Sequence, residues 1–265
     1  MYINRRILCR IGTVRPCGYI ATNHADSMKF YGVIVLLALV TFAHGLPTST
    51  KTKRSISDNL VSLVESFQDT MKTGDEDLGI PVLEPFEADS IDISIDETSV
   101  ALDGNLSNLK VAGLSHFSID TLTFSLIGIR FTFAFTWPSI TFSTGYSIDG
   151  TVSNDIAVYG NGNATGEITN LVVSGTAALS VSNSYLYIRS LTSEISVEDT
   201  EFAITGIWND DDVSKLIGDV VSDIAPVLVE EYQDEITTAV NEVVTEYAND
   251  YLGTMTLADL IGLLG

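Results

Sequence analysis

The sequence predicts an α+β fold in which a strongly curved antiparallel sheet wraps a long C-terminal helix, with a shorter helix near the N-terminus (a half-barrel, or super-roll). Two observations support this prediction. Between residues 91 and 207, apolar residues recur at every second position, which is the period of a strand with one buried face. Between residues 213 and 252 they recur at steps of three and four, which is the period of one helix face.

The long helix has recognisable start and stop signals. The acidic run 210–212 precedes its first apolar position, where carboxylates accept hydrogen bonds from free N–H groups and meet the positive end of the helix dipole. Gly253 follows the last periodic residue, where a helix stop is expected. Pro226 removes one backbone donor inside the run, so we expect a kink near residues 223–226.

The shorter helix is predicted at residues 55–72, and Gly74 marks its end. Its apolar residues lie on one face, which we expect to be core: Ile56, Leu60, Leu63, Val64, Phe67 and Met71.

The most informative strand segment is 122–137. Its apolar residues occupy even positions up to Leu126 and odd positions from Ile129. This change of parity at Ile127-Gly128 indicates either a β-bulge or a break between two strands.

Turn and breaker residues follow this segment. Pro138 is expected to interrupt strand pairing. Asp149-Gly150 and the run 160–163 (Gly-Asn-Gly-Asn) predict hairpin turns. Later strands are predicted around residues 171–173, 177–181, 185–191, 194–197 and 202–207.

The N-terminal region carries targeting signals. Residues 1–27 contain four arginines and no periodic pattern, so we interpret them as an upstream extension absent from the mature protein. Residues 28–45 combine a lysine, an apolar core and Ala43-His44-Gly45, the pattern of a secretory signal peptide. The core is shorter than the roughly 20 residues of a membrane span. We therefore expect a secreted, extracellular protein without an integral span; an arginine-rich organelle transit peptide is the competing interpretation.

The remaining chain divides simply. Residues 46–54 contain Lys51-Thr52-Lys53-Arg54 and are either a pro-segment cut at this dibasic site or a solvated tail. Residues 55–265 are expected to form a single domain. Both cysteines, Cys9 and Cys17, precede the predicted cleavage site, and a domain of this size can bury enough core without disulfides.

The composition is acidic. The chain has 13 basic and 35 acidic residues, a net charge of −22. After Gly45, 8 basic and 34 acidic residues remain, so the predicted mature form carries 8 − 34 = −26. This charge argues against nucleic acid and anionic membranes as partners, and against phosphorylated lipid heads as ligands.

Residues for catalysis or metal binding are scarce. After Gly45 the only histidine is His116, and no cysteine remains. The segment around Ser115-His116 lacks the second glycine of a nucleophile elbow, and no histidine pair for zinc or Gly-rich phosphate loop is present. We expect neither an enzyme nor a bound cofactor or metal. Asn105 and Asn163 begin glycosylation sequons, of which Asn163 is preferred because it falls in a predicted turn.

Three short motifs resemble a known family. The segments LGIPVLEPF (78–86), NLKVAGL (108–114) and GYSIDG (145–150) resemble insect takeout and juvenile-hormone-binding proteins. The order of helix, sheet and long helix is similar to that of the mite group 7 allergens. Both groups belong to the tubular lipid-binding superfamily, and the resemblance implies a curled sheet around a long helix enclosing an apolar tunnel. Takeout-type proteins carry a cysteine pair near the mature N-terminus, and its absence here favours the allergen-like branch.

The function expected from both arguments is a secreted, non-enzymatic carrier of a hydrophobic small molecule such as a lipid, fatty acid or terpenoid. A cell-surface receptor is a further candidate partner. Alternatives are a structural or surface-interaction protein with a filled core, and an immune-type binder of bacterial lipid. The expected ligand-binding residues are the apolar side chains of the strands and of the long helix: Phe124, Ile129, Phe131, Phe133, Phe135, Trp137, Phe142, Val220, Ile224 and Leu228.

Overall fold

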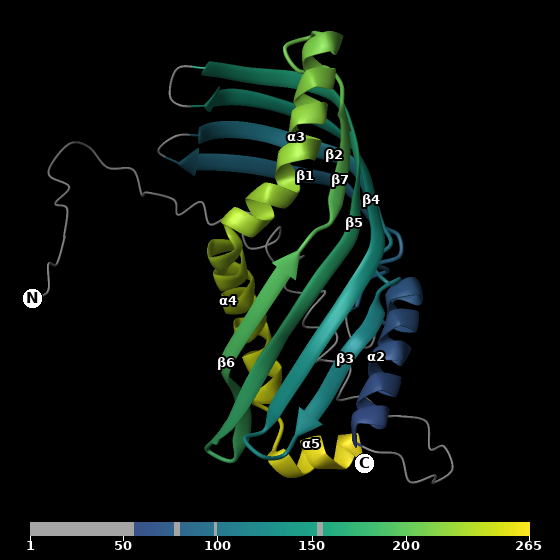
Figure 1. The fold of residues 1–265 in the computed structure, drawn as a ribbon, viewed down its shortest axis with the longest axis vertical. Coiled ribbons are helices and arrows are strands. Elements are labelled where there is room, and N and C mark those ends of the chain that lie inside the picture. Colours follow the sequence, from purple (N-terminus) through teal and green to yellow (C-terminus); the bar gives the residue numbers. More distant parts are fainter. Residues whose placement is uncertain (1–55, 77–79, 98–99, 153–155) are drawn as a thin grey trace, which may run out of the picture.

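A computed structural model describes residues 56–76, 80–97, 100–152 and 156–265. The expectations for 1–27, 28–45 and 46–54 lie outside these residues. Figure 1 confirms the predicted fold class, a curved antiparallel sheet accompanied by helices. The strands are β1 (Phe86–Glu97), β2 (Val100–Ala112), β3 (Ser118–Ser125), β4 (Arg130–Val152), β5 (Ile156–Ser182), β6 (Tyr185–Ser196) and β7 (Asp199–Ile204). The helices are α2 (Ile56–Thr73), α3 (Asp211–Glu231), α4 (Gln233–Leu252) and α5 (Leu257–Leu264).

Two long strands form the spine of the sheet. β4 and β5 are 23 and 27 residues long and pair with each other throughout. The other edge of β4 pairs first with β3 (130–136) and then with β2 (141–152). The other edge of β5 pairs with β7 (164–169) and then with β6 (172–182). The sheet therefore has a lower half with β3 and β6 and an upper half with β1, β2 and β7 (Figure 1).

Pro138 lies where the neighbour of β4 changes. On the β5 side the pairing continues past it without a register shift, from Trp137 with Leu171 to Ser139 with Thr169. On the other side the pairing with β3 ends at residue 136 and that with β2 begins at residue 141. Pro138 therefore interrupts pairing on one edge only, where a residue without an N–H leaves no donor unpaired.

The parity change in 122–137 is a break between two strands and not a bulge. β3 ends at Ser125 and β4 begins at Arg130, and the two pair as a hairpin. The turn between them contains Gly128 (φ +81°) and Ile129 (φ 43°), both in the left-handed region.

The predicted turns at Asp149-Gly150 and 160–163 are wrong. Both segments lie inside long strands, in β4 and β5. Their glycines permit close approach of neighbouring backbone: a Cβ on Gly150 would lie 2.1 Å from the Ala101 carbonyl oxygen, and one on Gly162 would lie 2.0 Å from that of Thr205. The strands predicted at 171–173 and 177–181 are likewise both parts of β5, and those at 185–191 and 194–197 overlap β6.

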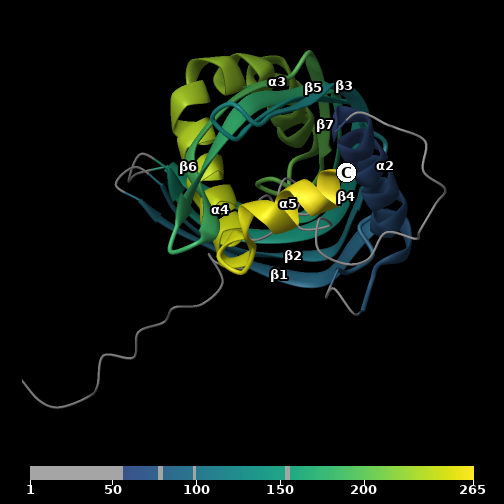
Figure 2. The same cartoon turned by 90° about the horizontal axis from the view of Figure 1, so that it is seen from below.

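The prediction of a single long helix is also wrong, because residues 211–252 form two helices. The break is at Tyr232 (φ −102°, ψ 24°), whereas α3 continues through Pro226. The start and stop signals are confirmed: the Asp210 carboxylate accepts hydrogen bonds from the backbone of Asp212 and Val213, and Gly253 follows the end of α4. Figure 2 shows α3 and α4 forming, with the sheet, a ring around the long axis.

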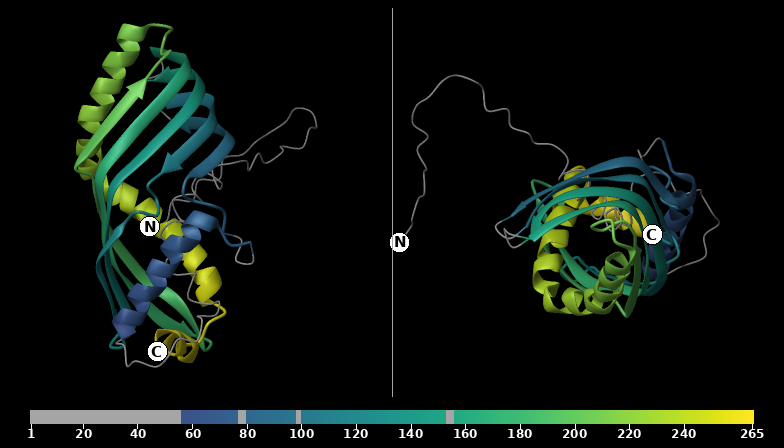
Figure 3. Two further views of the ribbon diagram at one scale, coloured as in Figure 1. Left: turned by 90° about the vertical axis from the view of Figure 1, so that its right-hand side faces the viewer. Right: turned by 90° about the horizontal axis from the view of Figure 1, so that it is seen from above.

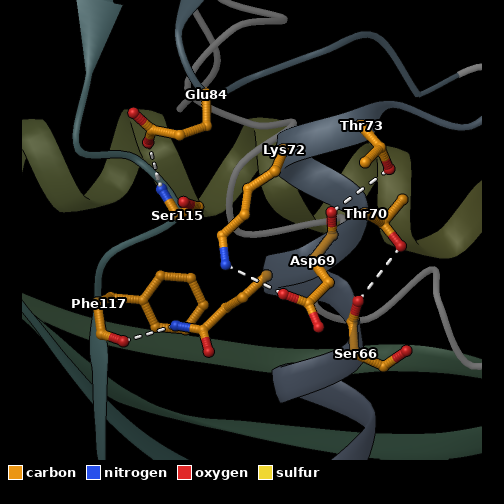
Figure 4. Close-up of polar contacts among 9 residues, drawn as sticks. Ser66, Asp69, Thr70, Lys72, Thr73, Glu84, Ser115 and Phe117 are labelled. Atoms are coloured by element: carbon orange, nitrogen blue, oxygen red, sulfur yellow. Dashed lines mark hydrogen bonds and ion pairs between the residues drawn. The ribbon is translucent and has the colours of Figure 1, made fainter.

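The short helix is confirmed as α2, and five of its six predicted core residues are buried. It packs on the lower half of the sheet, as the left view in Figure 3 shows. The Gln68 amide donates to the carbonyl oxygen of Phe117 at 2.6 Å, and the Glu84 carboxylate accepts from the N–H of Ser115 at 3.0 Å (Figure 4). These contacts tie the helix and the segment after it to the β2–β3 connection.

Candidate functional site

Packed side chains fill the space between the lower half of the sheet and the helices. Phe131 is 4% exposed and belongs to a cluster with α2, α4 and α5. Phe135 and Trp137, 9% and 5% exposed, belong to a second cluster with α2. The Trp137 indole N–H donates to the Leu114 carbonyl oxygen at 2.9 Å, which fixes the ring. The void beside Phe131 measures about 20 Å³, which is room for no more than about one water molecule.

The other aromatic residues predicted for the lower half also pack on this core. The ring of Phe124 lies 4.7 Å from that of Phe131, and Phe133 stacks on Phe135 at 5.8 Å. Ile129 packs against the first cluster. The structure thus brings these predicted site residues together, but with each other and with the helices rather than around an open space.

The upper half differs, because its apolar face is not covered by either core cluster. Phe142 pairs through Gly166 with Phe202, and their rings lie 5.9 Å apart above that glycine. The side chains on the same face are only half-buried. We call this set the upper apolar face: Ile91, Ile93, Ile95, Leu102, Leu106, Phe142, Ile148, Val158, Phe202 and Ile204.

One polar group lies within the upper apolar face. The Tyr146 hydroxyl donates to the Thr205 carbonyl oxygen at 2.6 Å. Burial raises the pKa of this phenol. Because its proton is already donated to backbone, Tyr146 fixes the sheet rather than offering a free donor.

α3 contacts the free edge of β7 through small residues. Ser214 and Ser222 are the hydrogen-bond acceptors for the N–H groups of Ile207 (2.9 Å) and Phe202 (2.8 Å). Between them Gly218 lies so close that a Cβ would be 2.8 Å from the Phe202 carbonyl oxygen. The helix therefore covers the edge of the sheet with serine oxygens in place of another strand.

α4 covers the free edge of β6 in the same way. The Asn249 amide oxygen accepts from the Ile188 N–H at 2.6 Å, and that of Gln233 accepts from the Ile195 N–H at 3.0 Å. Both helices thus use polar residues for their contact with the strand edges, while α4 also packs Ala248 and Leu252 in the lower core.

Five large apolar residues of α3 are left exposed. The α3 stripe, as we call it, is exposed to between 41% and 61% and consists of Leu216, Val220, Ile224, Val227 and Leu228. Val220, Ile224 and Leu228, which we expected to contact a ligand, therefore lie in an exposed stripe and not in a packed core. The physical reason is that the period of apolar residues identifies a face but not what covers it.

The C-terminal part of the α3 stripe, Ile224 and Leu228, lies on the same side as the upper apolar face, whereas Leu216 and Val227 point away from β7. A helix turns by about 100° per residue, so with Gly218 against β7, Asp219 projects to one side of that contact and Leu228 to the other. Asp219 lines a groove with Glu167 and Glu201. These two glutamates adjoin Gly166 and Phe202 in their strands and so point to the opposite face from Phe142 and Phe202. Leu228 is left on the apolar side.

The acidic groove holds about 770 Å³ and contains five carboxylates, from Glu167, Asp199, Glu201, Asp219 and Asp223. Phe142 and Phe202 also line the groove, but its Glu167 and Glu201 carboxylates lie on the opposite face of the sheet from these two rings. In the part of the chain that the structure describes, no three His, Cys, Asp or Glu side chains are placed to hold a metal ion.

Ser115 and His116, the candidate pair for nucleophilic catalysis, differ in their exposure to solvent. Ser115 is 2% exposed and its hydroxyl has no hydrogen-bond partner, whereas His116 is exposed. A nucleophile closed to solvent beside an outward-facing histidine does not form a working pair.

Both predicted glycosylation sites lie in strands. Asn163 is exposed in β5, and the Asn105 amide in β2 donates to Ser90 and Asp92 at 2.7 and 2.9 Å. Glycosylation itself stays a prediction.

Comparison with known proteins gives both a family and a fold. The family model for haemolymph juvenile hormone binding protein (JHBP) matches residues 33–262. The structure is similar to Takeout 1 of Epiphyas postvittana, with a TM-score of 0.53, 17% identity, and 77% of this chain and 96% of that chain covered. Lipopolysaccharide binding protein follows at a TM-score of 0.32 and 11% identity, with 78% and 40% covered. No match is found among curated proteins.

The family match and the similarity to Takeout 1 confirm the resemblance drawn from the three short motifs and the curled sheet expected from it. The preference for the allergen-like branch is not tested by them and stays a prediction. None of the helices in the described ranges is long and apolar enough to span a membrane. Since the family model covers most of the sequence, the chain belongs to the haemolymph juvenile hormone binding protein family.

Proposed function

We propose that this protein is a secreted, non-enzymatic carrier that binds a hydrophobic small molecule between the α3 stripe and the upper apolar face. The observation that carries the proposal is the exposure of five large apolar residues on α3 beside a half-buried apolar sheet face. Unpacked apolar surface of this kind marks a binding site, because leaving it in water is unfavourable by about 25 cal/mol per Å².

The proposal moves the binding site from the one expected from the sequence. Phe131, Phe135 and Trp137 stabilise the lower core, and Phe142, Val220, Ile224 and Leu228 are the predicted residues that we retain as ligand contacts. Membership of a family named for hormone binding supports a carrier role, as does the Takeout fold. Secretion rests on the signal-peptide pattern at residues 28–45.

Binding can be tested with protein purified from a eukaryotic secretory host. Native mass spectrometry is expected to show co-purified lipid, and extracted protein should bind the uncharged dye Nile red saturably with micromolar or tighter affinity. A folded protein that shows neither would contradict the carrier hypothesis and favour the alternative of a structural protein.

Two matched variants test the location. Ile224→Asp places a charge on the α3 stripe and should weaken dye binding at least tenfold. Ile127→Asp makes the same change in the β3–β4 turn, where Ile127 is 92% exposed, and should leave binding unchanged. Equal effects of the two substitutions would show that the dye does not bind at α3.

A further inference from the structure

We propose that the ligand of this carrier has an uncharged head group, such as an alcohol, ester or ketone, and that fatty-acid and phospholipid anions are excluded. The inference rests on the proposed function and narrows it. It follows from where the few cations of the described chain lie, and from the carboxylates that border the α3 stripe.

Five lysines and arginines occur among the described residues, and three of them are already paired with carboxylates. Lys72 pairs with Asp69 and Lys110 with Glu87, each at 3.0 Å, and Lys215 pairs with Asp219 at 2.5 Å. All three pairs are on the surface. Lys215, the one on α3, lies four residues before Asp219 and so on the groove side of the helix, away from Leu228.

The other two cations point away from the apolar interior. Arg130 and Arg189 are exposed, and each is the strand neighbour of a buried residue, Phe131 and Ile188. Because consecutive strand residues face opposite ways, both guanidinium groups lie on the outer face. Both also belong to the lower half, away from α3.

Negative charge surrounds the α3 stripe instead. α3 carries six carboxylates (Asp211, Asp212, Asp219, Asp223, Glu230 and Glu231) and one lysine, a net charge of 1 − 6 = −5. The acidic groove, which Asp219 and Asp223 of α3 line, adds Glu167, Asp199 and Glu201 on the outer face of the sheet.

A ligand anion would therefore lose in either position. Buried on the upper apolar face, its carboxylate would be desolvated with no cation partner from the described residues, which is strongly unfavourable. Held at the rim, it would lie beside like charges. An uncharged polar head meets neither penalty.

The test compares two ligands with the same alkyl chain in displacing Nile red from full-length mature protein at pH 7.5. Dodecan-1-ol should displace the dye at a concentration at least tenfold below that needed for dodecanoic acid. Equal potency, or a more potent acid, would overturn the inference while leaving the carrier hypothesis intact. No dye binding at all would overturn the proposed function and this inference with it.

Because an alcohol also leaves water more readily than a carboxylate, a charge variant separates the site from the solvent. Leu228→Lys supplies a cation on the apolar side of α3, where Leu228 is 41% exposed and the substitution can be tolerated. It should improve displacement by the acid at least fivefold relative to the alcohol. Glu65→Gln changes the net charge equally at an exposed position of α2 and should leave the ratio as in wild type. An unchanged ratio in Leu228→Lys would refute the role of the missing cation.

Discussion

The packing of α3 against β7 predicts opposite effects of one substitution at two helical glycines. In an open helix position, replacing Gly by Ala stabilises by up to about 1 kcal/mol, because Ala loses less backbone entropy on folding. Gly262 in α5 is such a position, since a Cβ there would meet no atom within 4 Å. Gly262→Ala should therefore stabilise the protein by about 0.5–1 kcal/mol.

At Gly218 the same change should destabilise. A Cβ would lie 2.8 Å from the Phe202 carbonyl oxygen, where ordinary contacts begin at 3.4 Å, so helix and strand must separate by about 0.6 Å. Overpacking of this kind costs about 1–3 kcal/mol. The shift also stretches the hydrogen bonds from Phe202 and Ile207 to the α3 serines, worth about 1 kcal/mol each. After the helix-propensity gain, we expect a net loss of about 1–3 kcal/mol.

Urea unfolding followed by circular dichroism measures both variants, and an unchanged m-value would show that the two states remain comparable. The midpoint should rise for Gly262→Ala and fall for Gly218→Ala. If both substitutions stabilise to the same extent, α3 does not rest on β7 through Gly218 and the exposure of its apolar stripe is not explained.

Three further outcomes follow from the same structure. Ile224→Asp should change the free energy of unfolding by less than about 1 kcal/mol, since Ile224 is 42% exposed, whereas Ala248→Asp buries an unpaired charge at a fully buried position and should cost more than about 3 kcal/mol; similar losses in urea unfolding would contradict the assignment of the helix faces. Asn249→Ala should remove the acceptor for the Ile188 N–H and destabilise by about 1–3 kcal/mol, with faster hydrogen exchange at that amide; unchanged exchange would mean that α4 does not cover the β6 edge. Mass spectrometry of secreted protein should find an N-terminus at Leu46 or later, and peptides containing Cys9 or Cys17 would refute the predicted processing.

Periodicity in the sequence was sufficient for the elements whose apolar face is packed. Nearly every residue of the apolar face of α2 is buried in the core, including Leu60, Val64 and Phe67. The curved sheet followed from the alternation of apolar and polar residues. The glycine-rich segments were wrongly predicted as turns. Glycine is common in turns, but it is also needed where two strands approach closely, as at Gly150 and Gly162.

The candidate site was only partly predictable. The apolar period of α3 indicated an amphipathic helix, but it did not show whether protein, ligand or solvent covers the apolar face. The sequence did contain a signal for the face that contacts the sheet. Small residues recur at intervals of four at Ser214, Gly218 and Ser222, and they let the helix backbone approach a strand. The break at Tyr232 had no such signal, since neither glycine nor proline occurs there.

The location of the ligand is tested most directly by photoaffinity labelling. An uncharged alkyl probe carrying a diazirine would be bound to the extracted protein and irradiated, and the labelled peptides identified by mass spectrometry. Label is expected on α3 (Asp211–Glu231) and on the upper apolar face, and it should be lost when dodecan-1-ol is present in excess. Saturable label confined to Phe131, Phe135 and Trp137 would place the ligand in the lower half and contradict the filled core described above.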